Sequence, residues 1–171
     1  MHTRKLIALV LLSVFSLNLV SSCGWRLRGA LTLPASMERV FLEGESSSEL
    51  RRTVSSILKG SAANLVADKV SASVVIVIAN NKASKRVLSL TSAGVANEYE
   101  LMYYLQYSVE TNDGKPLLGQ SEIAYQRTFR FDPNQILASQ KEEDKLRNEM
   151  IVQATTQMLR RIATQLRQGK S

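Results

Sequence analysis

The chain has 171 residues and is basic, with 22 Lys and Arg side chains against 15 Asp and Glu side chains. Its only histidine is His2 and its only cysteine is Cys23, so residues 24–171 contain neither an imidazole nor a thiol. That part of the sequence therefore excludes a Ser-His-Asp or Cys-His catalytic centre, a zinc site built from His and Cys, and an internal disulfide. It also contains no Gly-rich phosphate-binding loop, and we expect no cofactor and no metal.

Residues 1–22 have the layout of a signal peptide. Arg4 and Lys5 form a basic start, an apolar segment runs from Leu6 to Val20, and small residues follow it. The apolar segment is too short for a membrane-spanning helix, which needs about 20 predominantly apolar residues. We therefore expect residues 1–22 to be removed as a lipoprotein signal peptide.

Cys23 is the predicted lipid attachment site. Val20–Cys23 has an aliphatic residue, two small residues and a cysteine, which is the order that lipoprotein processing requires. Several acyl chains on one residue anchor a protein stably, whereas a single chain would be marginal. In bacterial lipoproteins an Asp after the cysteine commonly retains the protein at the inner membrane, so Gly24 favours the outer membrane. The alternatives are an ordinary cleaved signal with a cysteine near the cut, or a buried free cysteine.

Residues 23–171 are expected to form a single lipid-anchored domain. Their length of 149 residues suits one compact core and not two. Without Arg4 and Lys5, 20 basic side chains remain against 15 acidic ones. This excess favours an anionic partner. An exported, lipid-anchored domain rarely meets nucleic acid, and we expect no nucleic-acid partner.

The first half of the domain predicts a strand, a helix and a second, long strand. Residues 37–44 have the mixed pattern of a strand covered on more than one side. Ser46–Glu49 offers a capping box, the apolar residues from Leu50 to Leu58 recur at helical spacing, and Gly60 ends the run. Residues 70–79 contain a β-branched segment typical of a central strand, which bends at residues 80–83 and continues through residues 86–90.

The second half predicts a long hairpin. Residues 98–110 alternate with period two, which indicates a half-buried strand. Asn112–Gly114 gives the turn signal. The side chains expected on the buried face of the two strands are Tyr99, Leu101, Tyr103, Leu105, Tyr107, Val109, Leu117, Ile123, Tyr125, Phe129 and Phe131. Arg127 is in phase with these aromatic residues, so it either extends past them or binds a ligand there.

A final amphipathic helix completes the predicted fold. Asp132–Gln135 is a start signal and Ser139–Glu142 repeats it, so the helix either restarts there or continues after a kink. Apolar residues then step by four from Leu146 to Leu166. The predicted order is β-α-β-β-β-α, which gives an α+β two-layer sandwich with two helices packed on one face of a four-stranded sheet.

Several short segments, taken in their order and spacing, point to a known family. They are Cys23–Gly29 with Leu33-Pro34, Arg86–Leu90, Gly94, Glu98–Leu101, Asp113-Gly114, Phe131-Asp132, Ile136–Ala138 and Glu142-Glu143. Together they resemble the LptE family of lipopolysaccharide-assembly lipoproteins, and the resemblance runs nearly from end to end. It implies a non-enzymatic outer-membrane lipoprotein, held at the inner leaflet of that membrane by acylated Cys23, that faces the periplasm as a plug inside the lumen of the LptD β-barrel. It also implies that the protein assists assembly of this barrel and binds lipopolysaccharide during its transport to the cell surface.

Lipopolysaccharide binding requires fixed cations beside apolar surface, because lipid A presents phosphates next to acyl chains. The family often has a basic residue in the turn before its E-Y-E-L segment, whereas Thr91–Asn97 has none here. Cations in neighbouring elements could replace it. The candidate binding residues are Lys85, Arg86, Arg127, Arg130 and Lys141. Each of these could instead be an ordinary charge at the edge of the sheet.

Two other function classes remain open at this point. A generic outer-membrane adaptor would share the anchor but not the barrel partner or the lipid. A periplasmic hydrolase would need paired carboxylates, and the eleven Glu and four Asp form no recognisable pair. A carboxylate pair buried in a cleft would favour the hydrolase.

Overall fold

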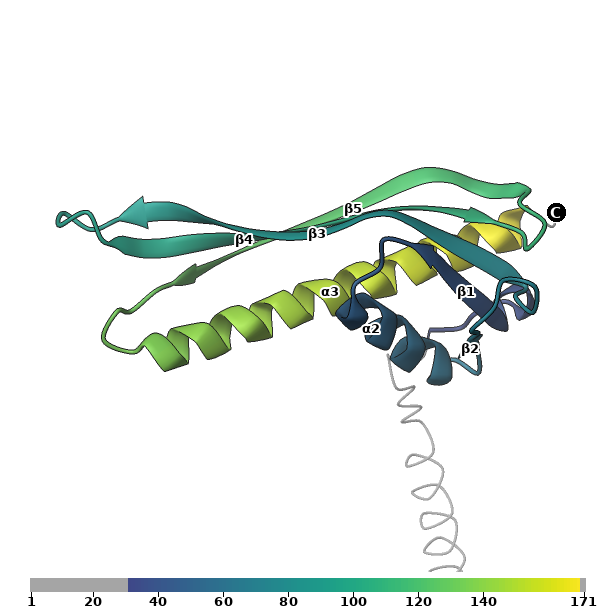
Figure 1. Ribbon diagram of the computed structural model, residues 1–171, viewed down its shortest axis with the longest axis horizontal. Coiled ribbons are helices and arrows are strands. Elements are labelled where there is room, and N and C mark those ends of the chain that lie inside the picture. The colour runs from purple at the N-terminus through teal and green to yellow at the C-terminus, as the bar shows by residue number, and fades with distance from the viewer. Residues whose placement is uncertain (1–30, 170–171) are drawn as a thin grey trace, which may run out of the picture. The chain divides into compact units, whose positions relative to one another are not determined.

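The computed structural model describes residues 31–169, and Figure 1 shows their arrangement. The predicted signal peptide and the predicted lipid site at Cys23 lie outside these residues and stay predictions. The elements in chain order are a short 3-10 helix η2 (Ala35–Met37), β1 (Arg39–Gly44), α2 (Ser48–Lys59), β2 (Asn64–Leu65), β3 (Val74–Leu90), β4 (Ala96–Glu110), β5 (Pro116–Arg130) and α3 (Ile136–Gln168).

The sheet is mixed, with the strand order β2-β1-β3-β4-β5. β1 is parallel to β2 and to β3, and the β3–β4 and β4–β5 pairs are antiparallel. Both α2 and α3 lie on the same face of this sheet (Figure 1). The predicted α+β two-layer sandwich is confirmed, but the sheet has five strands rather than four. The additional strand, β2, has only two residues and is too short to produce a periodic pattern in the sequence.

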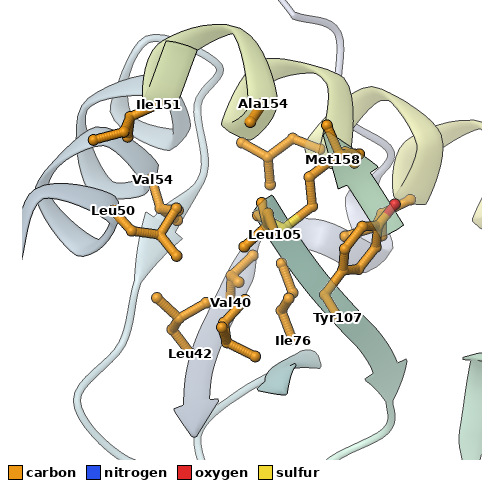
Figure 2. Close-up of a cluster of buried hydrophobic side chains, with 14 of the residues drawn as sticks. Val40, Leu42, Leu50, Val54, Ile76, Leu105, Tyr107, Ile151, Ala154 and Met158 are labelled. Atoms are coloured by element: carbon orange, nitrogen blue, oxygen red, sulfur yellow. The ribbon is translucent and has the colours of Figure 1, made fainter. Parts of the chain in front are cut away.

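The hydrophobic core lies between the sheet and the two helices. Figure 2 shows side chains from β1, β3 and β4 meeting those of both helices. α2 contributes Leu50, Val54 and Leu58, which are fully buried. From α3 the core receives Met150, Ile151, Ala154, Met158, Leu159, Ile162 and Ala163. The predicted apolar stripes of the two helices are therefore core stripes, because burial against the sheet removes their surface from water.

α2 begins one residue later than the predicted capping box would place it. The N-cap is Ser47, whose hydroxyl accepts a hydrogen bond from the backbone N–H of Leu50 at 3.1 Å. This bond satisfies an amide that has no partner within the helix. The C-cap is Gly60, as the sequence predicts.

β3 is one continuous strand of 17 residues. Its first part is central and lies between β1 and β4, and Val74, Val75 and Ile76 are fully buried. β1 pairs with β3 only as far as Ile78, where the register with β4 shifts before Asn80. This irregularity lies where the sequence predicts a bend. Beyond it the sheet contains only β3, β4 and β5.

β5 differs from the predicted pattern at its start. Tyr107 pairs with Ser121 but Val109 pairs with Leu118, so β5 has an extra residue between these pairs. A bulge of this kind reverses which side chains face the core. Leu117 is consequently 42% exposed, and Leu118 packs against the core in its place.

α3 is continuous from Ile136 to Gln168, so the helix neither restarts nor breaks at the second start signal. Asp132 does not cap it; its carboxylate accepts from the backbone N–H of Asn134 at 2.9 Å. The Ser139 hydroxyl accepts from the backbone N–H of Asp132 at 3.1 Å and so fastens the preceding loop to the helix. Within residues 31–169, neither α3 nor any other helix combines the length and the apolar character needed to cross a membrane.

Candidate functional site

Lys85 lies on the helix-facing side of the sheet, among aromatic rings. Its Nζ is 4.3 Å from the ring centroid of Tyr99 and 5.7 Å from that of Phe129. The two rings are stacked with centroids 5.7 Å apart, and Phe131 meets Tyr99 edge-on at 5.5 Å. A cation over aromatic faces is stabilised by the ring quadrupole. Lys85 is thus held beside aromatic surface, which the sequence predicted for Arg127 and Arg130 and not for Lys85.

Lys85 also forms an ion pair with α3. Its Nζ is 2.5 Å from Glu143 Oε2, and Arg147 contacts the other carboxylate oxygen at 2.7 Å. Burial acts to raise the pKa of Glu143, but the hydrogen bonds from Lys85 and Arg147 outweigh it and hold that pKa below its usual value. Glu143 is therefore ionised at neutral pH and neutralises much of the charge on Lys85.

Arg86 lies on the opposite face of the sheet, because consecutive strand residues point to opposite sides. Its Nε donates to Glu100 Oε2, and Gln126 Nε2 donates to Glu100 Oε1. The Glu100 side chain is only 2% exposed, whereas that of Arg86 is 63% exposed. The hydrogen bond and charge of Glu100 raise the pKa of Arg86 above its ordinary value. Arg86 thus has a structural partner that the sequence did not reveal.

Arg127 and Arg130 also lie on opposite faces. The Arg127 guanidinium donates to Gln153 Oε1 of α3 at 2.8 Å and lies 5.9 Å from the Tyr125 ring centroid. It extends past the aromatic residues to the helix, which is the first of the two predicted outcomes. Arg130 is exposed on the outer face, where it pairs in register with Glu98 of β4.

Lys141 is exposed on the second turn of α3. Within residues 31–169, neither Lys141 nor Arg130 forms an ion pair. The five candidate cations therefore do not form one cluster. Two face the helix layer, two lie on the outer face of the sheet, and Lys141 lies on the helix.

Exposed apolar side chains accompany these cations at one end of the domain. The β3–β4 hairpin and the start of α3 both lie at that end (Figure 1), and Phe131 N–H donates to Asn97 O at 2.8 Å to hold the connection to α3 against β4. We define the hairpin-end surface by its exposed apolar residues and its cations. It consists of Val87, Leu88, Leu90, Val95, Ile136 and Leu137, with Lys85, Arg86, Arg130 and Lys141.

Two carboxylates, Glu49 and Asp144, line one hollow of the described chain, but both side chains are exposed and the pKa of Glu49 is lowered, so this is not the buried pair that the hydrolase requires. Glu100 is the only buried carboxylate among residues 31–169, and both of its oxygens accept hydrogen bonds. No group of three or more Asp and Glu side chains in this range is placed to hold a metal ion. A catalytic carboxylate pair needs two such groups at one cleft.

Comparison with known proteins decides the family. The chain matches the LptE family, described as Lipopolysaccharide-assembly, over residues 36–162. It belongs to the LptE family. As an LptE-family member, it is a non-enzymatic lipopolysaccharide-assembly lipoprotein. The LPS-assembly lipoprotein LptE of Yersinia pestis is 28% identical to it over 160 residues, which cover 91% of this chain and 75% of that protein.

Solved structures share the fold of this LptE-family chain. Lipoprotein B from Nitrosomonas europaea, solved by solution NMR, is 27% identical, with a TM-score of 0.68 over 82% of this chain and 90% of that chain. The rare lipoprotein B from Shewanella oneidensis is 25% identical, with a TM-score of 0.65 over 78% of this chain and 99% of that one. The two-layer α+β fold is therefore one that this chain shares with other lipoproteins.

Proposed function

We propose that this chain is an outer-membrane lipoprotein, anchored through acylated Cys23, that plugs the LptD β-barrel and assists its assembly. We further propose that it binds lipopolysaccharide while this lipid is transported to the cell surface. Membership of the LptE family supports both parts. The domain would face the periplasm and occupy the lumen of the barrel.

The outer face of the sheet supports the barrel partner. No helix among residues 31–169 covers this face (Figure 1). By strand register it carries polar and aromatic side chains on β3, β4 and β5. The interior wall of a large membrane barrel is polar. A polar, uncovered sheet is complementary to such a wall.

The hairpin-end surface supports lipopolysaccharide binding. The observation that supports this proposal is that neither Arg130 nor Lys141 forms an ion pair with a described residue. Both lie in the hairpin-end surface, in which Leu88 and Leu137 are exposed. Phosphates need cations and acyl chains need apolar contact, and this surface has both. Lys85 and Arg86 already hold Glu143 and Glu100, so their contribution to lipid binding is expected to be smaller.

Copurification tests whether the chain forms a complex with a β-barrel protein. Affinity-tagged full-length chain, extracted from outer membranes in mild detergent, should recover a β-barrel protein in a stable complex. The generic adaptor predicts the tagged chain without a barrel. Recovery as a monomer would therefore favour the adaptor and count against the plug.

Binding of lipopolysaccharide to a charge-neutral double variant tests the lipid site. Arg130→Gln with Lys141→Gln should weaken binding roughly five- to tenfold, and the difference should shrink at high salt because exposed contacts are screened over about 10 Å at 0.1 M. The matched control is Arg52→Gln with Lys59→Gln, which removes the same charge from exposed positions on α2. Equal binding by both double variants across a salt series would show that the hairpin-end surface is not the site.

A further inference from the structure

A second hollow lies at the other end of the fold from the hairpin-end surface. It has a volume of about 500 Å³ and opens between the start of β5 and the C-terminal half of α3. The hairpin-end surface involves the opposite end of both elements, as their bounds and Figure 1 show. The residues that line the hollow are Tyr107, Leu118, Ser121, Gln157, Arg160, Arg161, Thr164 and Gln165.

The bulge in β5 shapes this hollow. The extra residue between Leu118 and Ser121 interrupts the pairing with β4 next to Tyr107. Bulges bend a strand and recur beside functional sites, because they leave part of the ladder unpaired and redirect a side chain. Gly119, within the bulge, has no atom within 4 Å of the position its Cβ would take. The sheet is therefore open at this point.

The Tyr107 side chain provides the main evidence that this hollow binds a ligand. It is fully buried and its hydroxyl donates to no described residue, although Arg161 and Ser121 lie close enough to donate toward it. Figure 2 shows this hydroxyl at the margin of the apolar cluster. Buried polar groups in folded proteins almost always have a partner, since an unpaired one is costly. Burial also raises the pKa of Tyr107, although Arg161 and Ser121 offset part of the rise, so the hydroxyl stays protonated and is available as a donor at neutral pH.

Two arginines border the same hollow without an acidic partner. Arg161 Nη1 donates to the backbone oxygen of Glu122 at 2.9 Å, which fixes its guanidinium at the strand edge. The Glu122 carboxylate accepts from Tyr104 and so is engaged elsewhere. Neither Arg160 nor Arg161 forms an ion pair within residues 31–169. The segment 1–30 contains no Asp and no Glu, so it has no side-chain carboxylate to offer them.

The other polar side chains that line the hollow offer further hydrogen-bond donors. Gln157 Oε1 accepts from the Tyr125 hydroxyl at 2.7 Å, which leaves the Gln157 amide N–H groups available. The hollow thus combines two guanidinium groups, a phenol and an amide as donors, and its lining contains no carboxylate. We propose that it binds a phosphate group, either as inorganic phosphate or as the headgroup of a lipid. Arg160 and Arg161 supply the charge, and the Tyr107 hydroxyl donates to a phosphate oxygen.

The test uses the full-length chain in micelles of a neutral detergent. Inorganic phosphate is titrated in one arm and micelle-embedded phosphatidic acid in the other, while the arginine Nε–Hε signals are followed by NMR. Saturable shifts of the Arg160 and Arg161 signals in both arms would support a site for the phosphate group itself, and shifts with phosphatidic acid alone would support a lipid headgroup site. Absence of saturable shifts in both arms would overturn the proposal.

Variants separate this site from general charge attraction. Tyr107→Phe should weaken binding about tenfold, the loss of one hydrogen bond to a charged group, while its thermal midpoint stays equal to or above that of the wild type. Arg160→Gln with Arg161→Gln should remove saturable binding. Arg52→Gln with Lys59→Gln removes the same charge on α2 and should bind as the wild type does. If this control weakens binding equally, or if Tyr107→Phe binds phosphate unchanged, the hollow is not a phosphate site.

Discussion

At the residue scale, Glu100 is the polar centre of the outer sheet face. It lies on a face that no described helix covers, yet its side chain is 2% exposed because neighbouring side chains shield it. Arg86 and Gln126 each donate to one of its oxygens. A buried carboxylate is tolerated when its oxygens are bonded and its charge is compensated. This arrangement links all three long strands, since the three residues lie on β3, β4 and β5.

Replacing Arg86 should therefore destabilise the fold. Arg86→Met leaves the buried Glu100 charge uncompensated and should lower the midpoint of denaturant unfolding. Arg86→Met with Glu100→Met should recover most of this loss, because removing both members of an ion pair costs less than removing one. Additive effects of the two single variants in a double-mutant cycle would contradict this account.

Gly44 is required at the end of β1. Its φ is +87°, and a Cβ would lie 2.3 Å from the backbone oxygen of Ile78. Gly44→Ala should therefore destabilise the domain by about 2–4 kcal/mol, since it adds a backbone clash to an unfavourable φ. Gly114→Ala is the matched control, because Gly114 also has a positive φ of +84° but no atom within 4 Å of its Cβ position. Chemical denaturation should give a clearly larger loss for Gly44→Ala, and equal losses would exclude the clash.

At the scale of elements, the ion pair between Lys85 and Glu143 fastens the long hairpin to α3. Beyond Ile78 the hairpin has no β1 beside it, so its contact with α3 includes this pair and the aromatic residues around it. Arg147 shares the same carboxylate from one helical turn further along α3. The contact is therefore electrostatic in part and should depend on pH.

The lowered pKa of Glu143 gives the direction in which the stability of the domain should change with pH. Its folded-state pKa lies below the ordinary value of 4.5, because Lys85 and Arg147 outweigh the burial that would raise it. Its contribution to stability is therefore complete above pH 4.5 and is lost as the pH falls through the folded-state pKa. The difference in unfolding midpoint between wild type and Glu143→Gln should be largest near neutral pH and should vanish in acid. The exposed neighbour Glu142→Gln serves as the control, and a difference that is constant with pH would exclude the pair.

At the scale of the whole molecule, one domain presents surfaces with separate proposed roles. The uncovered sheet face suits a barrel wall, the hairpin-end surface suits lipopolysaccharide, and the hollow beside Tyr107 suits a phosphate group. Each surface uses a different set of side chains on the same scaffold. They can therefore be tested independently, because variants at distant sites usually act additively.

Anchoring is the remaining whole-molecule prediction. Cys23→Ala should abolish labelling by a fatty-acid analogue and block lipoprotein-type maturation, since Cys23 is the only cysteine in the chain. Radiolabelled palmitate incorporation, compared with wild type at equal expression, measures this. Persistent labelling of Cys23→Ala would place the lipid elsewhere.

The sequence by itself determined the class of the fold, and its resemblance to the LptE family was then established by comparison with known proteins. Period-two alternation from Tyr99 to Val109 and the stripe from Leu146 to Leu166 assign buried faces without knowledge of their partners. Because residues 24–171 contain no His and no Cys, the sequence excludes catalytic centres that depend on an imidazole or a thiol. These conclusions depend on local periodicity and composition, which the chain carries whatever its tertiary contacts.

Only the tertiary structure decided how individual side chains are used. It showed that β2 exists, that the β5 bulge packs Leu118 instead of Leu117 against the core, and that α3 runs unbroken through Ser139. It also separated Lys85 from Arg86, which are adjacent in sequence but bind Glu143 on α3 and Glu100 on β4. These features depend on strand register and on contacts between residues that are distant in sequence, and no local pattern encodes them.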